Sequence, residues 1–354
     1  MEKDQSFHKI LSRELSNVDI NRTYSSMKKL GTGRTSKVYS AKHPDHDKRI
    51  VLKCILKEAT KKKEFLKEFH YSYSLSTHPT IINTFETAFE TSKYYVFAQE
   101  LAPETDLSKV MKKGGVGEEH TKRIAELVAF ALEFIHGKDL VHRDICLENI
   151  FVFDKDYKTV KIGDFGHVQK VGTVVKKIKN LRTAWAPPEV CAALPNEGYS
   201  CKMSVDAWQL GILIFACLTG AYPWYSAEFT DNNYKAWVGW IKKKTTDIPP
   251  RFSQFSPRLL SLFRRLLEPK PSARAEVKEV YKYALDPWLP KDENDEEINI
   301  NLSCPNVYLP NATGKADKDQ KEIVDVLRQN RWTKWRPHMV SNSRQPQGLL
   351  ARRR

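Results

Sequence analysis

The sequence lacks the features that mark membrane, secreted or zinc-stapled proteins. Its most apolar stretch covers only residues 208–220, which is too short to cross a bilayer. The six cysteines form no CxxC pair, and no histidine stands at zinc-finger spacing from them, so we expect reduced thiols. The opening segment MEKDQSFHKI is polar and has no apolar centre, so we expect no secretory signal. We therefore expect a soluble protein of the cytoplasm, with the nucleus as an alternative.

Acidic residues are scarce relative to basic ones. The chain has 58 Lys and Arg against 43 Asp and Glu, a formal net charge of +15. Such an excess suits acidic partners, although a solvated basic surface is the simpler explanation. No zinc finger, RNP motif or interleaving of aromatic and basic residues accompanies the charge, so nucleic-acid binding is the weakest hypothesis and is not expected.

The chain divides into a lead-in, two blocks and a tail. Residues 1–23 are polar, and residues 24–102 alternate apolar and polar positions around one charged helical run. Residues 103–290 are mainly helical in pattern, and the almost wholly apolar run 205–218 predicts a buried helix. Residues 291–354 turn acidic and then basic, which predicts a partly disordered tail. The predicted fold class is α+β, with a small β-rich lobe and a larger helical lobe.

The strongest chemical signal lies in the second block. Asp144 and Asn149 belong to the sequence VHRDICLEN, and Asp164 begins a DFG fifteen residues after Asn149. Phosphoryl transfer needs metal ions that bridge the phosphates and a carboxylate that orients the attacking hydroxyl. Asp144 fits the role of the carboxylate, whereas Asn149 and Asp164 offer the hard oxygen ligands that suit Mg²⁺. The order and spacing of these residues make two unrelated loops a poor explanation.

The first block contains a glycine-bearing turn and a strand lysine. Gly31 and Gly33 would let the backbone approach phosphate oxygens, and Ser36 stands where a third glycine is usual. On its own the turn is better explained as a plain β-turn. Lys53, at the end of the predicted strand IVLK, would hold phosphates as a point charge.

Together these motifs resemble a serine/threonine protein kinase over about residues 24–290. Within that superfamily the chain is most similar to the SH3-domain-binding kinase family. The narrower resemblance rests on AQELAP at 98–103, on His167 after the DFG, and on GILIF at 211–215. It implies a bilobal fold, ATP and Mg²⁺ as cofactors, and protein substrates. SH3-domain binding has weak support, because the PxxP at 287–290 lacks a suitably spaced basic residue.

In kinases the strand lysine stands fifteen residues after a valine of the glycine-rich loop, as Lys53 does after Val38. The resemblance also implies a helical glutamate that pairs with this lysine. We predict Glu68, because it lies ten residues before the turn at His78 that closes this helix in kinases. Glu64, one turn earlier, is the alternative; away from Lys53 either residue would be a solvated helix position.

At the hinge between the lobes, the resemblance implies an adenine pocket. Gln99 would lie at its back, and the backbone groups of Glu100 and Ala102 would bond the base. Asp106 would reach the ribose, although a surface turn residue is nearly as good an interpretation. The expected cofactor-binding residues are Leu30, Gly31, Thr32, Gly33, Ser36, Val38, Val51, Lys53, Glu68, Gln99, Glu100, Ala102 and Asp106; the catalytic residues are Asp144, Lys53 and Asn149; the metal ligands are Asn149 and Asp164.

The chain departs from the family pattern beside the catalytic aspartate. Cys146 stands where these kinases carry a lysine that touches the γ-phosphate, and Leu147 replaces the following proline. Arg182 aligns with the threonine that bonds that lysine, which leaves Thr183 one place away, and Pro187 replaces an alanine. One lost charge-assisted contact costs about 1.5–3 kcal/mol, or about ten- to a hundredfold in rate. We therefore expect a slowed kinase in which Arg182 supplies some charge near the phosphate, with a pseudokinase scaffold as the alternative.

The segment after the DFG is basic. Arg143 is the residue that commonly receives an activation-segment phosphate in this superfamily. Between His167 and Trp185 the only hydroxyl-bearing residues are Thr173 and Thr183, amid five basic residues. This composition favours acidic substrates and little need for phosphorylation.

Overall fold

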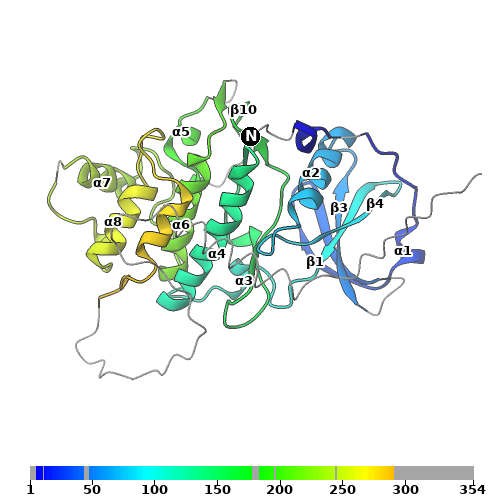
Figure 1. Cartoon of the computed structure of the whole chain (residues 1–354), viewed down its shortest axis with the longest axis horizontal. Helices are drawn as coiled ribbons and strands as arrows, with labels where there is room; N and C mark the ends of the chain where they lie inside the picture. Colours follow the sequence, from blue (N-terminus) through cyan, green and yellow to red (C-terminus); the bar gives the residue numbers. More distant parts are fainter. Residues whose placement is uncertain are drawn as a thin grey trace, which may run out of the picture. The chain divides into compact units, whose positions relative to one another are not determined.

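The computed structural model describes residues 5–290, except residues 11, 44–47, 178–182, 195–196 and 244. The predictions for the tail 291–354 and for Arg182 lie outside the described residues. Within the described part, Figure 1 shows strands β1 to β4 grouped with helix α2, and helices α4 to α8 grouped separately. None of these helices is both long and apolar enough to pass through a bilayer.

The first lobe is a five-stranded antiparallel sheet in the order β1-β2-β3-β5-β4. Its strands are β1 (Ser25–Thr32), β2 (Ser36–Lys42), β3 (Arg49–Leu56), β4 (Thr84–Glu90) and β5 (Tyr94–Glu100). Because side chains alternate along a strand, Ile50, Leu52 and Cys54 of β3 enter one apolar cluster, whereas Lys53 points to the opposite face.

Helix α2 (Lys62–Leu75) carries Glu68 and packs against the sheet. Phe65 of this helix is fully buried, with ring centroids 5.0 Å from Tyr95 and 6.0 Å from Phe97 of β5. These aromatic contacts fix the helix over the sheet. The predicted sheet with one major helix is therefore confirmed.

The polar lead-in is folded onto this lobe. After a 3₁₀ turn at Gln5–His8, Leu15 is buried in the cluster that contains Phe65, and the backbone N of Val18 donates to the carbonyl of Glu90 at 2.9 Å. A short helix, α1 (Ile20–Thr23), leads into β1. The described part of the lead-in thus covers α2 and the end of β4.

The second lobe is mainly helical, as predicted. Its helices are α3 (Leu107–Val110), α4 (Glu118–Gly137), α5 (Pro188–Cys191), α6 (Ser204–Thr219), α7 (Asn232–Ile241) and α8 (Pro257–Leu266). The 3₁₀ helices are Leu147–Asn149, Thr183–Trp185, Pro250–Phe252 and Val277–Tyr283. Short strands pair as β6 (Leu140–Val141) with β9 (Gln169–Lys170), β7 (Ile150–Val152) with β8 (Val160–Ile162), and β10 (Val174–Lys176) with β11 (Gly198–Ser200).

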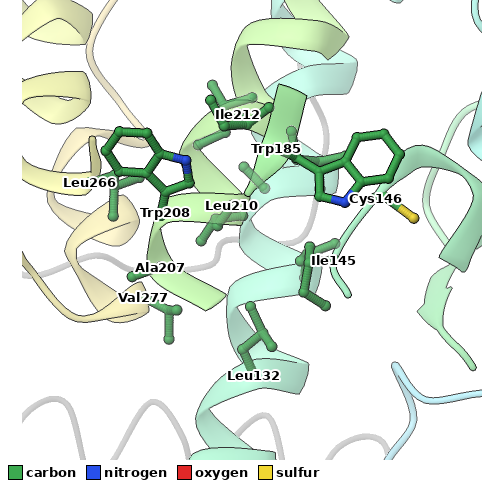
Figure 2. Packing of buried hydrophobic residues seen from close by; sticks show 14 of the residues in the cluster. Leu132, Ile145, Cys146, Trp185, Ala207, Trp208, Leu210, Ile212, Leu266 and Val277 are labelled. Atoms are coloured by element: carbon green, nitrogen blue, oxygen red, sulfur yellow. The ribbon is translucent and has the colours of Figure 1, made fainter. Parts of the chain in front are cut away.

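The core of this lobe surrounds α6, which the sequence predicts to be buried. Figure 2 shows Leu210 and Ile212 of α6 in one cluster with Leu132 of α4 and Leu266 of α8. Trp208 is fully buried in the same cluster. Helix α6 also carries Asp206 and Gln209, which accept hydrogen bonds from the loop between β6 and β7.

Candidate active site

Lys53 joins the two lobes. Its Nζ lies 2.7 Å from Oε1 of Glu68 on α2 and 3.0 Å from Oδ1 of Asp164, which follows β8. Burial disfavours the charged ammonium, but the negative charges of Asp164 and Glu68 outweigh it and raise the pKa of Lys53. Burial likewise opposes ionisation of Asp164, yet the charge of Lys53 lowers the pKa of that carboxyl to about 2. Both groups are therefore ionised at neutral pH.

The structure distinguishes the two candidate glutamates. Glu68 contacts Lys53, whereas Oε2 of Glu64 accepts a hydrogen bond from the backbone N of Lys61 at the start of α2. Glu64 thus caps its own helix. A Cβ on Gly166 would lie 3.0 Å from Oε2 of Glu68, so the glycine of the DFG allows this close approach.

Asp144 and Asn149 are held together in the loop between β6 and β7. Nδ2 of Asn149 donates to Oδ2 of Asp144 at 2.9 Å and to its carbonyl at 2.8 Å. Burial raises the pKa of Asp144, the charge of His167 opposes this shift, and that of Asp164 adds to it. The charges of Asp144 and Asp164 therefore act on each other, although the residues come from different loops.

Two side chains of helix α6 hold this loop through hydrogen bonds to its backbone. The buried carboxylate of Asp206 accepts hydrogen bonds from the backbone N of His142 at 2.8 Å and of Arg143 at 2.7 Å. Oε1 of Gln209 accepts from the backbone N of Ile145 at 3.0 Å. Arg143 has a φ of 73° and Asp164 a φ of 61°, a left-handed backbone that is uncommon outside glycine and is often found at functional sites.

The glycine-bearing turn connects β1 and β2 next to Lys53. In the sheet, Gly31 pairs with Val38 and Val38 pairs with Lys53, so the loop and the lysine share one end of neighbouring strands. A side chain at Gly31 would meet no atom within 4 Å, which shows that the space beside the turn is open. At Gly33, a Cβ would lie 3.1 Å from Oγ of Ser36.

The hinge residues lie at the end of β5. Nε2 of Gln99 donates to Oγ1 of Thr84 at 3.0 Å, and Oε1 of Glu100 accepts from Nζ of Lys161 at 2.6 Å. The backbone N of Glu100 already donates to the carbonyl of Asn83, and Ala102 is buried. The Gln99 side chain therefore joins β5 to β4, whereas that of Glu100 joins β5 to β8 of the second lobe.

The structure contradicts the interpretation of Asp106 as a surface turn residue, and its contact with the ribose stays a prediction. It is buried rather than a surface turn residue, and its carboxylate accepts from Nζ of Lys109 at 2.5 Å and from the hydroxyl of Ser108. The carboxylate is thus engaged at the start of α3.

The departures from the family pattern remain visible in the structure. Cys146 is 6% exposed. Burial, together with the charges of Asp144 and Glu148, raises the pKa of its thiol well above the usual value, so the side chain is neutral. Oγ1 of Thr183 donates to the carbonyl of Tyr225 at 2.7 Å. Cys146 therefore supplies no positive charge at the position where the family has a lysine.

The activation segment is anchored at its far end. Arg274 binds Glu189 through two guanidinium nitrogens, at 2.8 and 2.9 Å. Sequence reasoning missed His167 and Tyr199 as site residues. The place of His167 directly after the DFG was an available signal, whereas Tyr199 reaches Arg143 only through the tertiary fold.

A two-lobed fold in which a strand lysine, a helical glutamate and two loop aspartates converge defines a protein kinase. Residues 24–288 match the protein kinase domain family, and the chain belongs to it as a serine/threonine protein kinase.

Within this class, the chain is a member of the SH3-domain-binding kinase family, as its sequence predicts. It is 38% identical over 279 residues to serine/threonine-protein kinase SBK1 of Danio rerio, which covers 78% of this chain and 72% of that protein. The identity to SBK1 of Mus musculus is 36% over 272 residues, covering 77% and 65%. The identity to serine/threonine-protein kinase meng-po of Drosophila melanogaster is 38% over 307 residues, covering 85% and 67%.

Proposed function

We propose that this chain transfers the γ-phosphate of ATP to serine and threonine hydroxyls of proteins, at a rate that Cys146 reduces. The observation that supports this proposal is the convergence of Lys53, Glu68 and Asp164 at 2.7 and 3.0 Å, beside the Asp144–Asn149 pair. These groups have the charges and positions that phosphoryl transfer requires.

The residues present fit a magnesium ion that is shared with the nucleotide. Among the described residues, no cluster of three or more histidine, cysteine or acidic side chains would hold a metal alone. Asp164 is ionised, and Asn149 offers an amide oxygen, because its Nδ2 is turned toward Asp144. One or two such ligands plus phosphate oxygens is the usual environment of Mg²⁺ in kinases, where the ion neutralises charge on the phosphates.

Lys53 and Asp144 take different parts in the proposed reaction. Lys53 remains protonated and binds phosphate oxygens as a point charge, while Glu68 positions it. Asn149 engages Oδ2 of Asp144, so we assign Oδ1 to the substrate hydroxyl and its proton. The raised pKa of Asp144 makes it a better proton acceptor than an ordinary aspartate.

A pseudokinase is the second candidate, and the neutral Cys146 is the observation that favours it. Losing one charge-assisted contact slows transfer by about ten- to a hundredfold, however, whereas loss of Asp144, Asp164 or Lys53 would remove the base, the metal ligand or the phosphate contact. All three are present. We therefore favour a slow enzyme over an inactive scaffold.

Transfer of radiolabelled phosphate from ATP to a protein substrate tests the proposal. Asp144→Asn is the matched control, because it keeps the shape of the side chain and removes the base. We expect transfer by the wild type and near-complete loss in the variant. Equal incorporation by both proteins would remove the enzymatic proposal, and nucleotide binding without transfer would favour the pseudokinase.

Partners and location extend the proposal. The basic segment after His167 supports a preference for acidic protein substrates. A peptide library in which basic residues around the acceptor are preferred would contradict this. We propose the cytoplasm or nucleus as the location. The PxxP at 287–290 is not presented for SH3 binding: Trp288 is fully buried, and its backbone N donates to Glu118 at 2.8 Å. An SH3 domain needs an exposed extended ligand, so we propose no SH3 contact at this segment.

A further inference from the structure

Arg143 connects three parts of the catalytic lobe from a buried position. Its backbone N donates to Asp206, Nη1 donates to the carbonyl of His167 at 2.9 Å, and Nη2 donates to the phenol oxygen of Tyr199 at 2.9 Å. The guanidinium carbon lies 5.6 Å from the centre of the Tyr199 ring. Because Asp144 is the next residue in the chain, contacts that hold Arg143 also hold the catalytic carboxylate.

Among the residues that the structure describes, no acidic side chain hydrogen-bonds to the guanidinium of Arg143. Among the described residues, the side-chain bonds of Arg143 go to a carbonyl and a phenol, and Nε has no hydrogen-bond partner. Lys67 of α2 lies close enough that the charge of Arg143 adds to the effect of burial and lowers the pKa of this lysine. Burial raises the pKa of Tyr199, so its phenol stays neutral. The guanidinium of Arg143, a group that would suit a phosphate, is thus bound by the uncharged phenol oxygen of Tyr199.

Tyr199 is fastened to the segment that follows the DFG. It lies on β11, where it pairs with Val175 of β10. The pairing continues beyond the strands, since the backbone N of Cys201 donates to the carbonyl of Thr173 at 2.9 Å and that of Gly172 donates to the carbonyl of Cys201 at 2.8 Å. The phenol therefore links Arg143 to an ordered part of the activation segment.

The two hydroxyls that the sequence offers for phosphorylation contact other groups or solvent. Thr173 is exposed, and Oγ1 of Thr183 donates to the carbonyl of Tyr225. Neither makes a hydrogen bond to Arg143, whose side-chain partners are His167 and Tyr199.

We propose that Tyr199 is a positioning residue whose phenol takes the place of an activation-segment phosphate. It holds Arg143 against the carbonyl of His167 and thereby fixes Asp144 and the segment after the DFG. A hydrogen bond from a charged donor is strong enough for this task, and a phenol, unlike a phosphate, cannot be removed by a phosphatase. The kinase therefore reaches its full rate without phosphorylation of its own segment.

The kinetic test uses the full chain after phosphatase treatment, with mass spectrometry to verify that no phosphate remains. We expect wild-type kcat to be unchanged by the treatment. Tyr199→Phe should lower kcat about tenfold and leave the KM for ATP within about twofold, because Arg143 loses one charge-assisted bond far from the nucleotide contacts. Tyr225→Phe is the matched control, since the Tyr225 side chain is 82% exposed, and its kcat should equal that of the wild type.

Hydrogen exchange gives a readout that does not need activity, which matters because the kinetic test rests on the proposed function. Tyr199→Phe should accelerate amide exchange over residues 167–176 and leave α4 unchanged. If the wild type transfers no phosphate, the proposed function fails, while the exchange experiment still decides the role of Tyr199. The inference would be overturned if Tyr199→Phe showed the amide exchange and the kcat of the wild type. It would also be overturned if dephosphorylation removed wild-type activity, or if the active form carried a phosphate on Tyr199.

Discussion

Replacing Cys146 with lysine should accelerate phosphate transfer. The thiol is neutral, because burial and the charges of Asp144 and Glu148 raise its pKa. The same two carboxylates would favour the charged form of an ammonium placed there. Cys146→Lys would therefore add the positive charge that this position lacks.

The size of the effect follows from one charge-assisted contact to the transferred phosphate. Such a contact contributes about 1.5–3 kcal/mol, and each 1.36 kcal/mol corresponds to tenfold in rate, so kcat should rise about ten- to a hundredfold. The longer side chain has a steric cost, because Cys146 belongs to the buried cluster that also contains Ile145 and Trp185 (Figure 2). Overpacking of about 1–3 kcal/mol would lower the stability of the fold rather than the rate per folded molecule.

The assay is steady-state transfer of radiolabelled phosphate, normalised to the folded fraction. Cys146→Met is the matched control, since it lengthens the side chain without adding charge, and its kcat should not exceed that of the wild type. A folded Cys146→Lys protein with wild-type kcat would refute the reasoning that this site is slowed by a missing cation.

Three further predictions test other parts of the account. Glu68→Gln should lower kcat/KM for ATP by about tenfold or more because Lys53 loses an anionic partner, whereas Glu64→Gln retains a helix-capping group and should stay within about twofold; equal effects would contradict the pairing. Burial raises the pKa of Asp144, and only the ionised carboxylate accepts the hydroxyl proton. Activity should therefore be lost as the pH falls through that raised pKa. A profile of kcat against pH that is flat down to about pH 4 would be inconsistent with this. Leu15→Ala should lower the free energy of unfolding by about 2–5 kcal/mol because Leu15 is buried, and an unchanged denaturation curve would show that the N-terminal segment adds no stability.

The sequence predicted the parts of the site that depend on short-range spacing. Asp144 and Asn149 are five residues apart and meet in one loop, and Glu68 was found from its distance to the end of its helix. The α+β fold is confirmed, because alternating strands and an unbroken apolar run can be recognised in the sequence. The family is confirmed by the match of residues 24–288 to the protein kinase domain.

Contacts between segments that are distant in the chain could not be predicted from the sequence. Leu15 lies in one buried cluster with Phe65, fifty residues away, and a sparse apolar residue in a polar segment carries no periodic signal. Tyr199 reaches Arg143 only because β10 pairs with β11, and no local pattern predicts that register. Within the mainly helical block, Val277–Tyr283 forms a 3₁₀ helix, and short apolar patterns do not separate this helix type from an α-helix.

Calorimetric titration with ATP, with and without Mg²⁺, tests the central claim most directly. If Lys53 and Asp164 share a metal-bound triphosphate, the wild type should bind ATP more tightly with Mg²⁺ present, and Asp164→Asn should abolish that dependence while the protein remains folded. Binding that ignores Mg²⁺, or no binding at millimolar ATP, would contradict the account.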